Sequence, residues 1–147
     1  MATLIKNRSL QYPLVAVFEF DIASGDVMVN TSGVSQTFKA TTGTFDVIAL
    51  PVNSQVIGGD LVVETASNDS STATLSVGDS GSATRYLGAT SIKSAARTAL
   101  VPTGFMNSSG LDIRITLANA GGDATAGKVR LNVTYVVKNR QNETQIA

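Results

Sequence analysis

Residues 111–138, LDIRITLANAGGDATAGKVRLNVTYVVK, contain the clearest structural pattern in this 147-residue chain. Apolar side chains alternate with polar ones on both sides of a loop rich in glycine and alanine. The apolar positions are Leu111, Ile113, Ile115, Leu117, Val129, Leu131, Val133, Tyr135 and Val137. A period of two turns one face of a strand toward a core and the other toward water. The stretch therefore predicts a hairpin of two strands whose apolar face packs into a β-sandwich.

The rest of the chain repeats the strand pattern in shorter pieces. Apolar or alternating runs, separated by Gly, Asn, Asp and Ser, predict further strands at residues 14–22, 27–30, 34–38, 45–50, 55–65 and 73–77. The adjacent Gly58 and Gly59 predict a bulge, which lets a sheet bend. We therefore predict an all-β fold: an antiparallel β-sandwich, arranged as an eight-stranded jelly roll with at most one short helix. An immunoglobulin-like sandwich is the second topology, although the Cys and Trp of true immunoglobulin domains are absent.

Two segments depart from simple alternation. Thr90 is positioned to cap a short helix, which would carry Ile92, Ala95, Ala96 and Ala99 on one face. The alternative for this region is a strand over residues 97–101 that ends at Pro102. Residues 45–50, FDVIAL, are apolar enough to predict a strand buried on both faces.

Composition indicates one globular domain and excludes several classes of function. The chain is 43% hydrophobic, and 147 residues are enough to bury a core without disulfides. The absence of Cys and His removes thiol chemistry, the usual general base and the commonest metal ligand. A net charge of zero and 5% aromatic residues argue against nucleic-acid binding. No run approaches the ~20 apolar residues of a membrane span, and the N-terminus lacks the apolar core of a signal peptide, so we expect no membrane association.

Three local patterns resemble functional sites, and each has a simpler structural explanation. Residues 78–81 spell GDSG, as around the nucleophile of trypsin-like proteases, but that chemistry requires a His, and a tight turn explains the same residues. A Ser–Lys dyad of Ser91 or Ser94 with Lys93 has only local spacing in its favour. Four Gly-Asp pairs match no calcium-binding loop. We therefore expect no enzyme activity, no cofactor and no metal.

The two ends of the chain differ from its centre. Residues 1–13 and 139–147 are polar and aperiodic, whereas residues 14–138 contain the strand pattern. We therefore predict an N-terminal arm (1–13), a jelly-roll domain (14–138) and a C-terminal tail (139–147). Polar ends that cannot enter a core either fray or lie against a partner.

Three segments have a pattern found in phage structural proteins. They are VIALPVNSQVIGGDLVVET at residues 47–65, ATLSVGDS at residues 73–80 followed by RYL at 85–87, and DATAGKVRLNVTY at residues 123–135. Together they cover about residues 45–137. In these segments the chain resembles the capsid decoration (cement) proteins of tailed bacteriophages, and the resemblance extends to other jelly-roll parts of virions.

The resemblance implies a structural virion protein, made in the bacterial host cytoplasm and bound to the outer capsid surface. Such proteins form homo-oligomers, either dimers or trimers, and bridge neighbouring subunits of the major capsid protein, which stabilises the DNA-filled head. The alternative is a head-fibre, tail or receptor/carbohydrate-binding jelly-roll module. That class would need an exposed aromatic or Asp/Asn cluster, such as a groove lined by Tyr12, Tyr86 or Tyr135.

We predict capsid or oligomer contacts in three parts of the chain. The arms cannot enter the core yet carry basic side chains, and the loop of the predicted hairpin has small residues that let another backbone approach closely. The predicted contact residues are Lys6, Arg8 and Tyr12 in the N-terminal segment, Gly121, Gly122 and Asp123 in the loop, and Lys138 and Arg140 at the C-terminal end.

Overall fold

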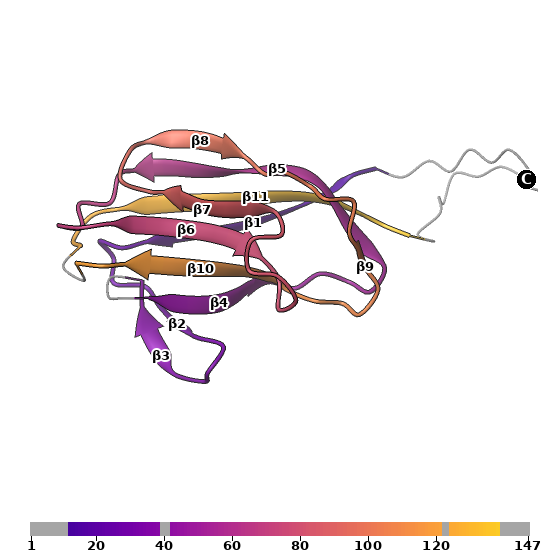
Figure 1. The fold of residues 1–147 in the computed structure, drawn as a ribbon, viewed down its shortest axis with the longest axis horizontal. Coiled ribbons are helices and arrows are strands. Elements are labelled where there is room, and N and C mark those ends of the chain that lie inside the picture. The colour runs from indigo at the N-terminus through magenta and orange to yellow at the C-terminus, as the bar shows by residue number, and fades with distance from the viewer. Residues whose placement is uncertain (1–11, 39–41, 122–123, 139–147) are drawn as a thin grey trace, which may run out of the picture.

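The computed structural model describes residues 12–38, 42–121 and 124–138, which form a sandwich of two antiparallel sheets (Figure 1). The first sheet has the order β1-β11-β5-β8, and consists of β1 (Leu14–Asp21), β11 (Lys128–Val137), β5 (Ser54–Thr65) and β8 (Ala96–Ala99), with the short β9 (Met106–Asn107) beside β5. The second has the order β4-β10-β6-β7, and consists of β4 (Gly43–Ile48), β10 (Ile113–Asn119), β6 (Ala73–Gly78) and β7 (Leu87–Ser91). A separate small hairpin pairs β2 (Val27–Val29) with β3 (Ser35–Thr37).

The strand order is that of a jelly roll. Of the eight strands that build the two main sheets, the first and the last lie side by side, and so do the second and the next to last. This nesting is the double Greek key of jelly rolls. The predicted fold class is therefore confirmed, although the eight strands are not the predicted eight. The strands predicted at residues 27–30 and 34–38 form the separate β2–β3 hairpin, and β7 and β8 complete the two main sheets. No helix occurs among the described residues.

The predicted hairpin at residues 111–138 is wrong in its pairing and correct in its pattern. Ile113, Ile115 and Leu117 of β10 are buried, as are alternate residues of β11. However, β10 pairs with β4 and β6, whereas β11 pairs with β1 and β5 in the other sheet. The intervening residues 120–127 carry the chain from one sheet to the other. Alternation shows which face of a strand is buried, and it does not identify the neighbouring strand.

Of the two interpretations of residues 90–101, the helix from Thr90 is wrong, and the strand predicted over residues 97–101 is confirmed as β8 at slightly different bounds. Residues 90–99 form the end of β7, a short connection and β8. Ile92 is fully buried between the sheets, and its N–H donates to the carbonyl of Ala73. A helix here would leave the neighbouring edges of β6 and β5 unpaired. The pairing of two sheets therefore prevails over a weak helical spacing of alanines.

Residues 45–50 are not buried on both faces. They lie largely in β4, an edge strand of the second sheet, and Phe45 and Ile48 face the core. Asp46 points outward, where its carboxylate pairs with Arg114 of β10 at 2.6 Å. The short strand β2 also has a different neighbour from the one next to it in sequence, because it pairs with β3 and not with the preceding β1.

The predicted bulge at the glycine pair is confirmed. Thr134 lies opposite Gly58 but Tyr135 lies opposite Val56, which leaves Ile57 as an extra residue in β5. Gly59 has φ +133°, a conformation that is essentially restricted to glycine. Its missing side chain also lets the carbonyl of Asn132 in β11 approach closely. The bulge bends β5, the longest strand of the first sheet.

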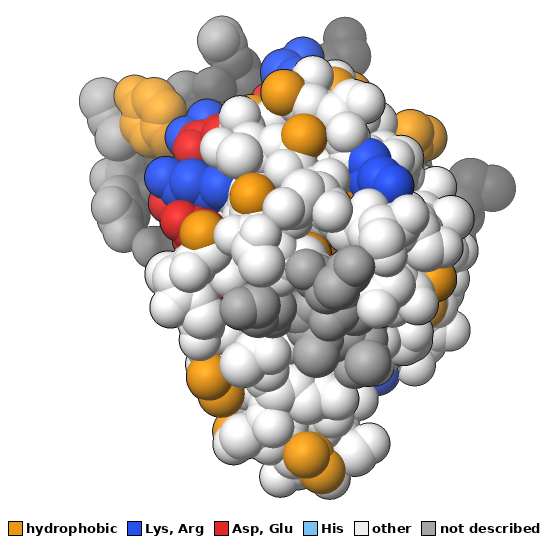
Figure 2. Space-filling view, turned by 90° about the vertical axis from the view of Figure 1, so that its left-hand side faces the viewer, with side chains coloured by type: hydrophobic (Ala, Val, Ile, Leu, Met, Phe, Trp, Pro, Cys, Tyr) orange, Lys and Arg blue, Asp and Glu red, His pale blue; other side chains and the backbone are white. Residues whose placement is uncertain are grey.

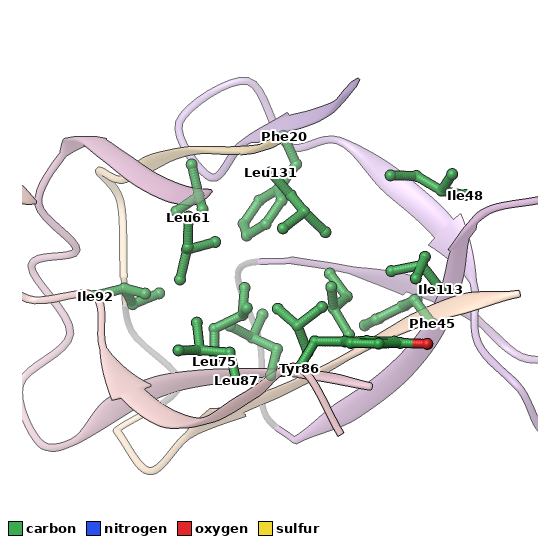
Figure 3. Close-up of a cluster of buried hydrophobic side chains, with 14 of the residues drawn as sticks. Phe20, Phe45, Ile48, Leu61, Leu75, Tyr86, Leu87, Ile92, Ile113 and Leu131 are labelled. Atoms are coloured by element: carbon green, nitrogen blue, oxygen red, sulfur yellow. The ribbon is translucent and has the colours of Figure 1, made fainter. Parts of the chain in front are cut away.

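The core fills the space between the two sheets (Figure 3). Phe20, Leu61 and Leu131 come from the first sheet, and Leu75 and Ile113 face them from the second. Toward the β1 and β4 edges, the core contains four neighbouring aromatic rings, Phe18, Phe20, Phe38 and Phe45. The rings of Phe20 and Phe38 stack at 4.3 Å, which anchors the end of the β2–β3 hairpin to the sandwich.

Candidate contact surfaces at the two ends of the sandwich

The residues that flank the domain emerge at one end of the sandwich. Because β1 and β11 are antiparallel neighbours, Leu14 at the start of β1 lies opposite Tyr135 near the end of β11. Figure 1 shows both strands meeting this end, on the right. Tyr12 precedes β1 and is 88% exposed, and Lys138 follows β11 and is also exposed. We call this the terminal end. Two of the predicted contact residues, Tyr12 and Lys138, therefore share one end.

The predicted contact loop lies at the opposite end. Gly121 belongs to the connection between β10 and β11, on the left of Figure 1, which we call the loop end. The ten residues of β11 separate the two ends by about 33 Å at ~3.3 Å per residue. The predicted contact residues thus fall into two sets that a single flat partner surface cannot touch together. Lys6, Arg8, Gly122, Asp123 and Arg140 lie outside the described residues.

The loop end is ordered by two side chains that sequence patterns did not identify as important. Asn68 accepts hydrogen bonds from the N–H groups of Thr125 (2.8 Å) and Ala126 (2.9 Å) through Oδ1. Asp69 is buried, and its Oδ1 accepts from the N–H groups of Ser71 (2.8 Å) and Gly121 (3.0 Å). The β5–β6 loop therefore fixes both sides of the β10–β11 connection. Figure 2 shows this end, covered mainly by backbone and uncharged polar side chains, with scattered hydrophobic side chains, a mixed acidic and basic cluster at the upper left and further basic side chains apart from it.

The terminal end is built around a buried asparagine. The side chain of Asn107 donates to the carbonyl of Leu111 and accepts from its N–H, both at 2.7 Å. The backbone carbonyl of Asn107 accepts from the N–H of Asn53, and the backbone carbonyl of Asn53 accepts from the N–H of Lys138, both at 2.7 Å. The exposed Val52 lies next to this chain of bonds. The backbone of Lys138 is therefore tied by a hydrogen bond to the connection between β4 and β5.

Charged residues on the outer face of the first sheet neutralise one another. Lys128 lies 3.0 Å from Glu19 and 3.3 Å from Glu64, and Arg130 lies 2.6 Å from Glu64. Hydrogen bonds from Lys128 to Glu19 and Glu64 raise the pKa of its ammonium group. Because these bases already have acidic partners, the described residues of this face offer no free cationic stripe to a polyanion.

A second polar cluster on this face makes acid stability depend on Asp60. Asn132 donates to Asp60 at 2.6 Å and Arg97 at 2.5 Å. The hydrogen bond from Asn132, reinforced by Arg97 and opposed by partial burial, lowers the pKa of Asp60 below 3.8. A depressed pKa in the folded state means that the unfolded chain binds the proton of Asp60 more readily. The contribution of Asp60 to the free energy of unfolding is therefore complete when the pH is above the pKa of the unfolded state, and it is lost as the pH falls through the pKa of the folded state.

We therefore expect the free energy of unfolding of Asp60→Asn to depend less on pH in the acid range than that of the parent protein. The difference in free energy of unfolding between the parent and Asp60→Asn should be constant above about pH 5 and should shrink as pH falls below 3.8. Urea unfolding at a series of pH values measures this difference. A difference that stays constant down to the acid limit would contradict the role of Asp60.

The residues that resembled catalytic groups have structural partners. Asp79 is buried and accepts from the N–H groups of Gly81 and Ser82, which makes residues 78–81 a tight turn, as predicted. Lys93 donates through Nζ to the carbonyl of Ser71 at 2.5 Å, and its backbone N–H donates to the hydroxyl oxygen of Ser91 at 3.3 Å. Within the described part of the chain, no three acidic side chains are grouped to hold a metal ion, and no helix is long and apolar enough to span a membrane.

Comparison with known proteins identifies relatives by structure. No family model matches the chain, and no curated protein matches it. A chain of the cyanophage Pam1 capsid asymmetric unit matches with a TM-score of 0.59 and 26% identity, over 92% of this chain and 94% of that one. A chain of the acid-stable capsid of Helicobacter pylori bacteriophage KHP30 has the same fold, with a TM-score of 0.58 and 19% identity over 85% and 87%. Over most of its length, this jelly roll is therefore similar to protein chains found in phage capsids.

Proposed function

We propose that this chain is a structural virion protein that binds the outer surface of a phage capsid and cements neighbouring major capsid protein subunits, stabilising the DNA-filled head. The observation that supports this most is the similarity to a chain of the Pam1 capsid asymmetric unit. Because the match covers 94% of that chain, the likeness is to a whole component of similar length. It is not a likeness to one domain of a much larger subunit.

The local chemistry supports a structural role over a catalytic one. A nucleophile needs an adjacent base, and a general acid or base needs a side chain free to exchange a proton. The carboxylate of Asp79 instead orders a turn and pairs with Arg85, and Lys93 is bound to a backbone carbonyl. Both groups therefore stabilise the local fold.

We assign the terminal end to the capsid. The predicted arms begin beside each other at this end, so one domain standing on the shell can place both against neighbouring subunits. Tyr12 and Lys138 add an exposed aromatic ring and a cation at the base of the arms. Lys6, Arg8 and Arg140, which lie outside the described residues, remain predicted contact residues of the arms. The loop residues Gly121, Gly122 and Asp123 would then contact a different neighbour, because they belong to the far end.

Deletion of the arms is expected to weaken binding without unfolding the domain. Heads of the encoding phage, prepared without this protein, would be incubated with the full chain or with chains lacking residues 1–11, 139–147 or both. We expect each deletion to lower affinity at least about tenfold, which corresponds to ~1.4 kcal/mol. Binding is measured by co-sedimentation, and circular dichroism and thermal melting confirm that each variant is folded.

The control for the arm deletions is a change at the loop end. Gly121→Ser should bind heads like the parent if the terminal end faces the shell. Unchanged binding by both arm deletions would make the arms bystanders. Failure of the full chain to bind heads, together with its absence from the outer surface in a particle reconstruction, would overturn the proposed function itself.

The alternative function is a head-fibre, tail or receptor/carbohydrate-binding module of the virion, and its carbohydrate-binding form has less support. Sugar sites need exposed aromatic platforms, and the three tyrosines do not form one. Tyr86 is 2% exposed within the core, where burial raises the pKa of its hydroxyl, and Tyr135 is half-buried in β11. Only Tyr12 is freely exposed among them.

A further inference from the structure

The first described strand has an open edge. Among the described residues, β1 lies at the border of its sheet and pairs with β11 alone. On its outer face Val15 is 64% exposed and Val17 is 58% exposed. Soluble proteins usually protect such edges with lysine, proline or a bulge. The eight residues of β1 contain none of these, so the strand presents a regular and partly apolar border.

Two hydrogen bonds identify which backbone groups face outward. The N–H of Ile22 donates to the carbonyl of Gly127 across the continuing β1–β11 register. Because hydrogen-bonded pairs alternate along an antiparallel ladder, the even-numbered residues of β1 point their backbone groups at β11. The odd-numbered residues point theirs away, and the N–H of Asp21 does so, since it meets a carboxylate oxygen of Asp26 at 2.9 Å.

The open part of the edge has defined limits. At one limit, Asp21 is satisfied locally: its N–H binds Asp26, and its carbonyl accepts from the hydroxyl of Ser24 at 2.9 Å. At the other limit, Pro13 has no N–H to donate. Between them, the outward groups of Val15, Val17 and Glu19 have no partner among the described residues. Val17 is the midpoint of this open segment.

We propose that β1 is a pairing edge for a second copy of this chain, with the two β1 strands antiparallel and a two-fold axis at Val17. Val17 then lies opposite Val17 of the second copy, and Val15 lies opposite Glu19. This register uses every outward N–H and carbonyl of the open segment, and it brings the exposed valines of both copies together on one face. The two first sheets become one continuous sheet across the axis.

The symmetry and charge of the edge favour a second copy over other occupants. A register shifted toward the end of β1 would place Glu19 against Glu19 or Asp21 of the other copy, and like charges directly opposite are unfavourable. A fold-back of the chain's own N-terminal segment would have to reverse next to Pro13. The residue before a proline is restricted to extended conformations, and Tyr12 is exposed and does not lie against β1. The midpoint register avoids both problems.

This pairing concerns the protein in solution and does not depend on binding to a capsid. It can therefore fail while the proposed function holds, and the reverse is also true. Sedimentation of the isolated full-length chain measures it directly, because a two-fold pair doubles the mass and cannot extend into a fibre.

The absence of cysteine makes a crosslinking test clear. Val17→Cys places a single thiol on the axis, where paired Cα atoms ~5.5 Å apart lie within the range that a disulfide spans. We expect mild oxidation to convert Val17→Cys to a covalent dimer at least about tenfold faster than Val101→Cys. Val101 is the matched control, because it is more exposed, at 67%, and lies outside β1. Equal crosslinking of the two variants would overturn the proposal.

A proline variant tests the backbone bonds. Val17→Pro removes an outward N–H and leaves every bond to β11 in place, so the fold should survive while the dimer is lost. Val17→Lys, which keeps the N–H but opposes two cations on the axis, should also be monomeric. A dimer that persists in both folded variants would overturn the proposal. A monomeric parent that dimerises when residues 1–11 are deleted would also overturn the proposal, since the chain's own arm would then occupy the edge. So would a dimer that this deletion abolishes, since the arm of the second copy would then occupy it.

Discussion

Replacing Gly59 by alanine is expected to lower the free energy of unfolding by about 3–5 kcal/mol, whereas the same change at Gly58 should alter it by less than ~0.5 kcal/mol. The backbone of Gly59 has φ +133°, and a side chain in this region costs roughly 1–3 kcal/mol. A Cβ there would also collide with the carbonyl oxygen of Asn132 in β11. Because that carbonyl belongs to a central strand, the collision cannot be relieved by a side-chain rotation.

Gly58 provides a control in the same bulge. It has no positive φ, and a Cβ built on it meets no atom within 4 Å. Thermal melting should show a fall of about 10 °C for Gly59→Ala, since ~1 kcal/mol shifts the midpoint of a chain this size by roughly 2–4 °C. Urea unfolding gives the free energies directly. Equal losses for the two variants would mean that the bulge tolerates any residue and that the geometry described for Gly59 is not what stabilises β5.

Replacing Asp79 by alanine is expected to cost about 3–5 kcal/mol, as for other broken buried ion pairs. Asp79 is 3% exposed, and its carboxylate accepts from Gly81 and Ser82 and pairs with the guanidinium of Arg85 at 2.5 Å. Alanine would leave both N–H groups without their acceptor. It would also leave Arg85, whose guanidinium lies 3.6 Å from the centre of the Phe105 ring, without its counter-ion.

Two neighbouring substitutions separate the contributions of Asp79. Asp79→Asn retains an oxygen for the two N–H groups and loses the charge, so its loss should be intermediate. Ser80→Ala changes the exposed residue that a protease-like mechanism would require, and it should alter the free energy of unfolding by less than ~0.5 kcal/mol. If Asp79→Ala is as stable as the parent, the GDSG turn has no structural role. A hydrolase activity lost in Ser80→Ala would overturn the structural interpretation.

The fold class could be predicted because burial leaves a direct trace in sequence. Alternation correctly identified the buried faces of β10 and β11, and the glycine pair correctly located the bulge in β5. Strand neighbours leave no such trace, because pairing depends on residues far away in the chain. For this reason the two strands of residues 111–138 were predicted as a hairpin although they belong to different sheets. The alanines of residues 95–99 suggested a helix because small residues suit either state.

The contact surfaces were less predictable than the fold. The bonds that order the loop end join Asn68 to Thr125 and Asp69 to Gly121, across 57 and 52 residues respectively. In the sequence, Asn68 and Asp69 are ordinary turn formers with no sign of a distant partner. The division of the contact residues between two ends likewise follows from the strand order alone. The sequence alone indicates which residues each contact segment contains. Which of these segments lie at the same end of the sandwich is decided by the topology.

The central position of the last strand sets the order in which this protein can be made. β11 lies between β1 and β5, so the first sheet has no continuous interior until residues 128–137 have left the ribosome. Until then, β1 and β5 both expose edges that β11 will cover. Long-range pairing of this kind is slow and exposed to aggregation, and the nascent chain must wait for its final strand. The first sheet of this jelly roll can therefore assemble only after residues 128–137 have emerged, however early β1 and β5 were made.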